Sequence, residues 1–294
     1  TGIDLKTDTA AVDRKRVPVP GTGLGILRSG TESRHADPSS LLPINQADYL
    51  TDTELLLITE TNKKSTVHRP AYMDMIELRR FDSQGPLFVE ACVIGLFSAV
   101  AYNSSGREVP VLRSKLQGGR ERSALPRHGH GSKTLENIIE NHPRKDLFQI
   151  SDDELFVTSM GILDLQERQR VRLFSRRDRY GRFYSSLVFV PRDRFNSDLR
   201  AQVGELLLEA YRGQAVEFDV YFSDSVLARI HYIIRVDPDN PPLQDHDLLE
   251  QQIATLARSW SDDLHRELVN QVGEESGNRL FSRCQPGVPV SYQQ

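Results

Sequence analysis

The sequence is poor in cysteine. Two cysteines occur in 294 residues, Cys92 in an apolar stretch and Cys284 in a polar one. Two cysteines so far apart do not form the disulfide framework that stabilises small secreted domains. We therefore expect a protein of a reducing compartment, the cytoplasm.

Long hydrophobic runs are also missing. No apolar stretch approaches the roughly 20 residues that a helix needs to cross a bilayer. Residues 1–16 are polar and contain acids, unlike a secretory signal peptide. These features predict a soluble protein without a membrane partner. The chain begins without methionine and ends in a coil-like stretch, 284–294, as expected for a piece cut from a larger protein.

An excess of charge of one sign is absent too. Lys and Arg number 37 against 41 Asp and Glu, which gives a net charge of −4. Such a balance creates no overall field that attracts nucleic acid or an anionic membrane, so we expect no nucleic-acid partner. Any binding patch must be local. With 38% hydrophobic residues, a chain of this length is expected to form two domains.

The first half reads as an irregular segment followed by a domain. Residues 1–50 are rich in Pro, Gly, Ser and charge, and we expect mostly loop there. Strands are predicted at 53–59, 73–81 and 87–101, with a short helix near 111–117. Because 87–96 is apolar on both faces, it is expected to be a central, covered strand. Residues 51–131 make up this first α/β domain.

The second half has clearer signals. Ser151 and Glu154 form a capping-box pattern that starts a helix, and Asn196 or Ser197 is placed to cap another. Further elements are predicted at 132–140 (helix) and at 170–175, 183–190, 216–222 and 226–236 (strands). The order helix, strand, strand, helix, strand, strand predicts an antiparallel sheet with helices on one face, an α+β ferredoxin-like domain over 132–240.

The segment 241–294 is predicted to be a helical extension and tail. Its apolar residues recur at helical spacing and predict one helix of about six turns. These residues are Leu249, Ile253, Leu256, Trp260, Leu264 and Leu268.

No motif predicts chemistry. The glycines of PGTGLGIL, residues 20–27, lack the strand before and the helix after that a dinucleotide site requires, so a loop without cofactor is the better interpretation. His128, His130, His142 and Cys92 do not have the spacing of a zinc site. No nucleophile-elbow motif is present. We expect no catalytic residue, no metal and no bound cofactor in this chain.

Arginine is concentrated between residues 168 and 194. Its planar guanidinium can make two parallel hydrogen bonds to a carboxylate or phosphate, so the stretch is a candidate effector or interface site. The alternative is a solvated or subunit-facing surface, because alternation along a strand turns every second side chain outward. The residues singled out are Arg170, Arg172, Arg182 and Arg192.

Two further stretches are candidates. RYGRFYSSLVFV, residues 179–190, is weakly similar to the aromatic strand of RNA-recognition domains, but Arg182 and Tyr184 depart from that pattern. In STVHRPAY, residues 65–72, the side chains of His68, Arg69 and Tyr72 either line a pocket or order the turn before Pro70.

Four stretches together carry a family resemblance. They are TNKKSTVHRPAYMDMIELRRFD (61–82), RKDLFQISDDELF (144–156), LQERQRVRLFSRRDRYGRFYSSLVFVPRDRFNSDLR (165–200) and SDSVLARIHYIIRVDP (223–238). They resemble the N-terminal regulatory part of the large NAD-specific glutamate dehydrogenases. The resemblance covers nearly the whole chain after about residue 50.

The resemblance implies a long enzyme that interconverts glutamate and 2-oxoglutarate with NAD, its dehydrogenase core lying downstream. It implies a PAS-like domain over 51–131 and an ACT-like domain over 132–240, whose element order is a circular permutation of the usual one. The implied partners are the downstream catalytic domain, neighbouring subunits of a homo-oligomer and an amino-acid effector. None of the matching motifs is a catalytic one.

Three functions remain open at this point. The first is an allosteric and assembly module of the dehydrogenase, inactive on its own. The second is a purely structural scaffold between domains. The third, and least favoured, is an RNA-binding module.

Overall fold

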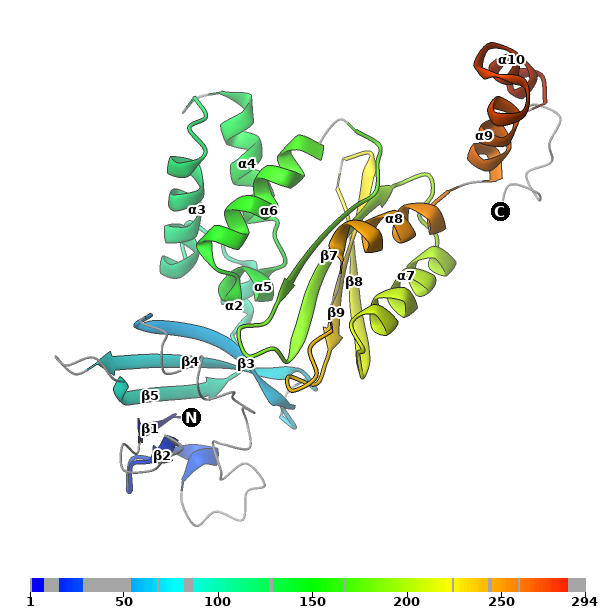
Figure 1. The fold of residues 1–294 in the computed structure, drawn as a ribbon. Helices are drawn as coiled ribbons and strands as arrows, with labels where there is room; N and C mark the ends of the chain where they lie inside the picture. Colours follow the sequence, from blue (N-terminus) through cyan, green and yellow to red (C-terminus); the bar gives the residue numbers. More distant parts are fainter. Residues whose placement is uncertain are drawn as a thin grey trace. The chain divides into compact units, whose positions relative to one another are not determined.

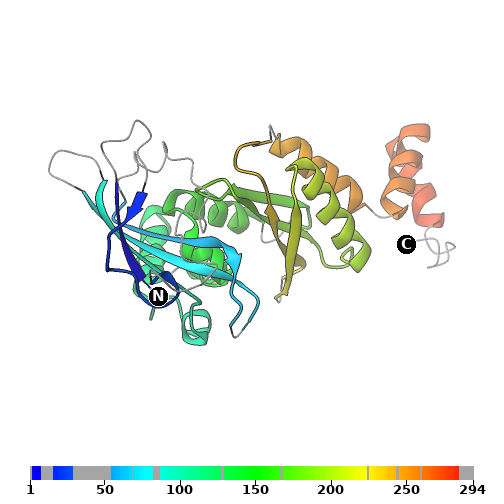
Figure 2. The same cartoon turned by 90° about the horizontal axis from the view of Figure 1, so that it is seen from below.

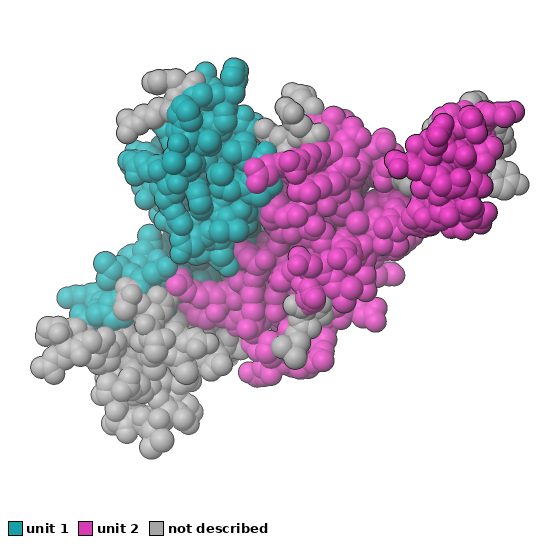
Figure 3. Space-filling view, turned by 45° about the horizontal axis from the view of Figure 1, so that its top comes forward, with its two compact units in different colours: residues 1–163 teal, residues 164–294 magenta. Residues whose placement is uncertain are grey.

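The structure is a computed structural model that divides into two compact units, residues 1–163 and 164–294 (Figures 1 and 3). Each unit is described by itself. The residues described are 2–7, 16–28, 54–67, 69–81, 87–126, 129–165, 168–223, 225–242, 245–258 and 260–284.

Unit 1 contains a five-stranded antiparallel sheet with the strand order β2-β1-β5-β4-β3. The three strands predicted after residue 50 are present, and β5 is central in the sheet. The strand predicted over 87–101 is too long, because it ends at Gly95 and residues 99–101 begin a helix. One face of β5 is not covered throughout, since Val93 is 44% exposed. The strands are β1 (Gly2–Thr7), β2 (Arg16–Pro18), β3 (Leu56–Lys64), β4 (Tyr72–Phe81) and β5 (Leu87–Gly95).

The expectation that residues 1–50 are mostly loop is wrong for their first part. β1 pairs with β5 along most of its length, with Leu5 opposite Glu90. The glycine run after β2 turns into a short 3-10 helix, η1 (Gly25–Leu27), whose Leu27 is buried. Pairing between strands so distant in sequence leaves no local signature, which is why composition alone indicated a loop.

Helices cover one side of the unit 1 sheet through a shared core. Ile58 of β3 packs with Leu112, Leu135, Leu147 and Leu155 from four different helices. The helices of this unit are α2 (Ala99–Asn103), α3 (Pro110–Arg122), α4 (His130–Glu140), α5 (Arg144–Gln149) and α6 (Asp152–Leu165).

The predicted capping box at the start of α6 is confirmed. The Glu154 backbone N–H donates to Ser151 Oγ at 3.2 Å, and the Ser151 backbone N–H donates to Glu154 Oε2 at 3.2 Å. The expected position of this helix is wrong, however. Leu155 belongs to the core of unit 1, so α6 does not supply the first helix of the second domain.

Unit 2 contains a four-stranded antiparallel sheet with the order β6-β7-β9-β8, and two helices pack against its core (Figure 2). The α+β sheet-and-helix architecture predicted from the sequence is confirmed. Its second helix is α8, from the segment expected to be an extension. The elements are β6 (Arg172–Arg177), β7 (Phe183–Pro191), α7 (Ser197–Ala210), β8 (Ala215–Phe222), β9 (Leu227–Arg235) and α8 (His246–Leu256).

Local sequence signals predicted the helix and strand bounds of unit 2 well. Asn196 caps α7, since its Oδ1 accepts the Leu199 N–H at 2.7 Å. The sequence also offers Gly213 as the end of this helix, but the left-handed residue there is Arg212, at φ +51°. Gly213 is needed for space instead, because a Cβ there would lie 2.5 Å from the side chain of Ile234.

The predicted six-turn helix at the C-terminal end is wrong. It is replaced by α8 and by a hairpin of α9 (Trp260–Val272) and α10 (Glu274–Cys284). Ile253 and Ala257 are buried in the unit 2 core, and α8 ends there. Gly273, at φ +83°, reverses the chain after α9. The apolar spacing continues in phase across the break between α8 and α9, so periodicity did not reveal that break.

Among the described residues, no helix combines the length and apolar character that crossing a membrane requires.

Candidate functional site

The predicted arginine residues of unit 2 do not converge. Arg170 is exposed just before β6. Arg172 lies at the start of β6 and forms an ion pair with Glu250 of α8, Nη1 to Oε1 at 3.4 Å. Glu250 Oε2 also accepts the Leu173 backbone N–H at 2.8 Å, so this pair ties α8 to the edge strand.

Arg182 lies in the turn at the other end of β6 and is buried. Its Nε donates to Asp178 Oδ2 at 2.7 Å and its Nη2 donates to Asp178 Oδ1 at 3.0 Å. Burial alone would raise the pKa of Asp178, but the charge and hydrogen bonds of Arg182 outweigh it and lower that pKa below the ordinary 3.8. The bidentate pair closes the β6–β7 turn.

Arg192 follows β7 and is exposed. Its guanidinium donates to the Ser223 carbonyl at 3.2 Å and lies over the Phe222 ring, 5.3 Å from the centroid. Arg172 and Arg192 thus lie near one end of the sheet and Arg182 at the other. The structure does not bring these arginines together at one site, and an effector or interface role for them stays a prediction.

The other predicted group, in unit 1, does come together with further residues. His68 lies outside the described residues. Arg69 belongs to the β3–β4 connection, and Tyr72 begins β4. We call the polar group around them the Asp74 cluster. Its members are Glu60, Arg69, Tyr72, Asp74, Tyr102 and Lys145.

Helix α5 is anchored to β3 and β4 in this cluster. Lys145 of α5 forms an ion pair with Glu60 of β3 and donates to the Tyr72 carbonyl at 3.2 Å. Glu60 lies directly opposite Asp74 in the β3–β4 ladder, so two carboxylates are neighbours on one sheet face. Both residues are almost fully buried, at 4% exposure each.

Asp74 accepts a hydrogen bond from a backbone N–H of the described residues. The Phe97 N–H donates to its Oδ2 at 2.9 Å. Burial is the main reason that its pKa is raised, and the Phe97 bond and the charge of Lys145 only partly oppose it. A carboxylate in this state is stabilised by any added positive charge.

Arg69 and Tyr102 complete the cluster. The Arg69 guanidinium lies over the Tyr102 ring, 5.0 Å from its centroid. Burial, with the nearby charge of Asp74, raises the pKa of Tyr102 to about 12, so its hydroxyl keeps its proton at neutral pH. Arg69 itself is exposed and forms no ion pair within the described residues. Among the described residues, Arg69 and Asp74 thus form no ion pair with each other, and each contacts another group of the cluster or its surroundings.

Two members of the Asp74 cluster, Arg69 and Tyr72, were predicted from the sequence. The other four members were not. Asp74 and Glu60 stand in apolar strands, YMDMIEL and LLITE, where a charged residue is unusual. That was the available signal. Lys145 and Tyr102 come from helices far along the chain, and no local pattern links them to these strands.

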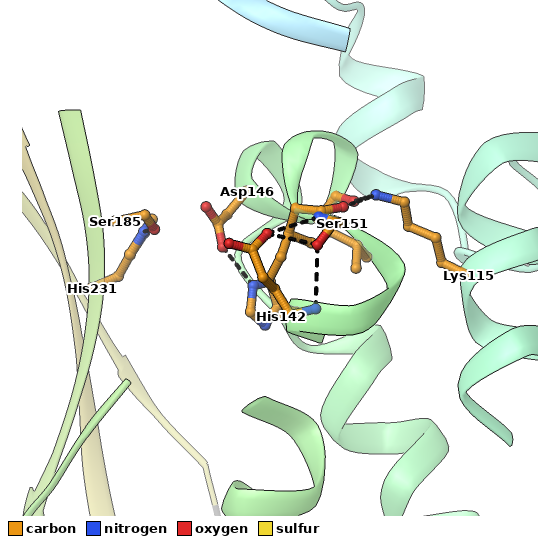
Figure 4. A network of polar contacts seen from close by, with 9 residues as sticks. Lys115, His142, Asp146, Ser151, Ser185 and His231 are labelled. Atoms are coloured by element: carbon orange, nitrogen blue, oxygen red, sulfur yellow. Dashed lines mark hydrogen bonds and ion pairs between the residues drawn. The ribbon is translucent and has the colours of Figure 1, made fainter. Parts of the chain in front are cut away.

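Among the described residues, each unit has a buried polar pair that involves histidine (Figure 4). Ser185 Oγ and His231 Nε2 are 2.9 Å apart in the unit 2 sheet, and His142 Nε2 is 2.6 Å from Asp146 Oδ2 in unit 1. All four side chains are buried. A nucleophile that acts on a substrate has to be reached by it, so we assign these pairs to packing. In the same region of unit 1, Lys115 donates to the Leu147 and Ile150 carbonyls.

Within the described ranges there is no group of three or more His, Cys, Asp or Glu side chains arranged to hold a metal ion. His128, one of the histidines weighed for zinc, lies outside those ranges.

Two family models match the chain. Residues 172–261 match the ACT2 domain of glutamate dehydrogenase, and residues 109–168 match its helical motif 1. The ACT2 match contains the whole unit 2 sheet with α7 and α8, whereas we expected the ACT-like domain at 132–240. The helical-motif match contains α3 to α6, which the structure places around the unit 1 core.

Similar proteins extend these matches over most of the chain. An NAD-specific glutamate dehydrogenase of Halomonas elongata is 41% identical over 276 residues, 94% of this chain. The chain belongs to the NAD-specific glutamate dehydrogenase family. Proteins of the same name from Pseudomonas aeruginosa and Mycobacterium tuberculosis are 37% and 29% identical over 84% and 83% of the chain. The chain spans only 15 to 17% of the length of these relatives.

Proposed function

We propose that this chain is a non-catalytic regulatory and assembly segment of a cytoplasmic NAD-dependent glutamate dehydrogenase. The parent reaction converts L-glutamate, NAD and water to 2-oxoglutarate, ammonia and NADH. NAD belongs to the catalytic domain of the parent protein. The partners of this segment are that catalytic domain, neighbouring subunits and an amino-acid effector.

The observation that carries the proposal is the ACT2 match over the four-stranded sheet of unit 2. The second match is a helical motif, so neither matched model is a dehydrogenase core. The polar pairs that resemble catalytic groups are buried. A segment of this kind acts by binding differently to two states of the enzyme that carries it.

The domain limits form part of the proposal. The strand order β2-β1-β5-β4-β3 is the order found in PAS domains, which supports a PAS-like assignment for the unit 1 sheet. The domain then includes β1 and β2 as well as residues from 51 onward. We propose 172–261 in place of 132–240 for the ACT-like domain, because α8 rather than α6 packs on its sheet.

The test compares this chain with the full-length enzyme. Alone, the chain is expected to form no NADH from glutamate and NAD. A full-length enzyme lacking residues 172–261 is expected to keep turnover but to lose its response to amino-acid effectors. Glutamate-dependent NADH formation by the chain alone, or an unchanged effector response after the deletion, contradicts the proposal.

A structural scaffold without ligand is the second candidate. It is favoured by two ion pairs inside unit 2, Arg172 with Glu250 and Arg182 with Asp178. Both arginines were predicted as ligand-binding groups, but here they stabilise the fold. It predicts that no amino acid binds the chain. The RNA-binding candidate is less favoured, because the aromatic side chains Phe183, Tyr184 and Phe189 of β7 are buried and do not offer faces for base stacking.

A further inference from the structure

We propose that the hairpin of α9 and α10 is a docking surface for the same hairpin of a second copy of this chain. The two hairpins form a four-helix bundle, in which α9 of one copy lies over α10 of the other. This inference rests on the proposed assembly role and names its surface.

The hairpin has almost no core of its own. Helices α9 and α10 lie side by side (Figure 1), and they are closest at Gly277, where a Cβ would lie 2.7 Å from the Val269 Cα. His265 Nε2 is 2.6 Å from Asn278 Oδ1, and its ring centroid is 4.7 Å from that of Phe281. Of the residues in these helices whose exposure is described, only Gly277 is buried. Two helices that meet so narrowly leave their other apolar side chains in need of a further layer.

These apolar side chains lie on one side of the hairpin. In α9, Leu264 and Leu268 come one position before the two residues that contact α10, and Leu280 of α10 stands in the same relation to a residue that contacts α9. One position is about 100° around a helix. Because the two helices are antiparallel, this step turns both sets toward the same side. We call this side the hairpin face, and its residues are Leu264, Leu268, Val272 and Leu280.

The hairpin face is open, whereas the opposite side of the hairpin is polar. Val272 is 46% exposed and Leu280 is 36% exposed. The opposite side carries the exposed residues Arg266, Asn270 and Ser282. An apolar face without charge docks on an identical face without burying an unpaired charge. Two-fold docking of this kind is closed, so it stops at a dimer.

Charges at the edges of the hairpin select the second copy and its orientation. Glu267 lies on the outer edge of α9 and Arg279 on the outer edge of α10, each about half a turn away from the contact between the helices. Both side chains are exposed. They lie at the same level along the hairpin, because each stands midway between the two residues through which its helix contacts the other helix. One edge of the hairpin is therefore acidic and the other basic at the same height.

This pattern distinguishes two ways of stacking the hairpins. If the two-fold axis runs along the helices, α9 lies over α10 of the second copy, and Glu267 meets Arg279 of that copy on both edges. If the axis runs across the helices, α9 lies over α9, and like charges meet. Charges that flank an apolar seam commonly set the choice and orientation of partner helices. The edge charges thus favour α9 over α10.

The first experiment measures the dimerisation of the chain by sedimentation equilibrium, from micromolar to submillimolar concentration. Leu268→Glu places a carboxylate in the hairpin face. Asn270→Glu is the matched control, because it adds the same charge two positions further along α9 on the polar side. Circular dichroism reports whether each variant keeps its helices.

Wild type is expected to form a reversible dimer. Leu268→Glu should weaken it about a hundredfold or more, since the bundle would bury an unpaired charge, while Asn270→Glu leaves it unchanged. A dimer that Leu268→Glu leaves intact overturns the surface. A monomer at every concentration also overturns it, and protection of the hairpin amides from hydrogen exchange would then assign the face to another part of the same chain.

The second experiment exchanges the edge charges and leaves the hairpin face unaltered, so it decides even if Leu268→Glu unfolds the hairpin. Glu267→Arg and Arg279→Glu should each weaken the dimer about tenfold, because each creates repulsion at two symmetry-related positions. The double variant should regain the wild-type affinity. Within one hairpin these residues lie on opposite edges, so the recovery has to arise between copies. A double variant as weak as the single ones overturns the arrangement, and the ACT2 deletion described above tests the regulatory function separately.

Discussion

The two units use opposite charges in different ways. In unit 2, Arg182 and Asp178 meet in a buried, bidentate pair in which every charge is matched. In unit 1, Asp74 and Arg69 lie near each other without forming a pair. A high density of arginine in a sequence therefore indicates contacts that stabilise the fold as readily as it indicates a binding site.

The largest expected effect is on the closed pair. Arg182→Met leaves the Asp178 carboxylate buried without its partner, which is expected to destabilise unit 2 by about 3 to 5 kcal/mol. Urea denaturation followed by circular dichroism, with hydrogen exchange of the β7 amides, measures this loss. Arg192→Met is the control in the same unit, because Arg192 is exposed, and it is expected to change stability by about 0.5 kcal/mol or less. Equal effects of the two substitutions would show that the buried pair contributes no more to the stability of unit 2 than an exposed arginine does.

The pH dependence of stability should have opposite signs at the two aspartates. The folded-state pKa of Asp178 is lowered, so its contribution is present above its unfolded value of 3.8 and is lost as the pH falls below it. The folded-state pKa of Asp74 is raised, so its ionisation costs stability as the pH rises from 3.8 through the folded value.

Asp178→Asn and Asp74→Asn separate the two contributions. Thermal midpoints measured between acidic and neutral pH are expected to show Asp178→Asn losing most stability at neutral pH and little at the acid end. Asp74→Asn is expected to lose nothing, or to gain, at neutral pH relative to the acid end. The same sign of pH dependence at both positions would show that Asp74 is compensated after all.

The smallest expected effect concerns helix caps, where the units are alike. Ser151 caps α6 and Asn196 caps α7, each through a side-chain oxygen that accepts a backbone N–H. Ser151→Ala and Asn196→Ala should each cost about 1 kcal/mol, measured by urea denaturation. A cost near zero in one unit only would mean that its helix is held by packing alone.

The sequence predicted those parts of the fold that have local signals. The capping box at Ser151 and the Asn196 cap depend on residues within a few positions of each other, and both were located correctly. β1 was missed because its partner is far away in the chain, and the break between α8 and α9 was missed because the apolar spacing runs through it. Helix α6 was predicted correctly as an element and assigned to the wrong core.

The candidate site was predictable only in part. Arg69 and Tyr72 were identified from a short stretch, and Asp74 lies two residues after Tyr72 in β4. Tyr102 and Lys145 join them only after folding brings α2 and α5 to this strand. Conversely, Arg172 and Arg182 are close in sequence, yet one lies at each end of β6. Nearness along a strand does not mean convergence, because each residue advances the chain by about 3.3 Å.

The pairing of β1 with β5 also has a consequence for biosynthesis. When the ribosome has made Thr7, it must still translate about 80 residues before Leu87, the first residue of the partner strand, exists. At typical elongation rates of about 5 to 20 residues per second, β1 waits roughly 4 to 16 seconds for its neighbour. Of the two strands that flank β1 in the sheet, only β2 exists by the end of that interval, so the nascent chain offers an unfinished sheet edge to chaperones and to other nascent chains on the same messenger RNA.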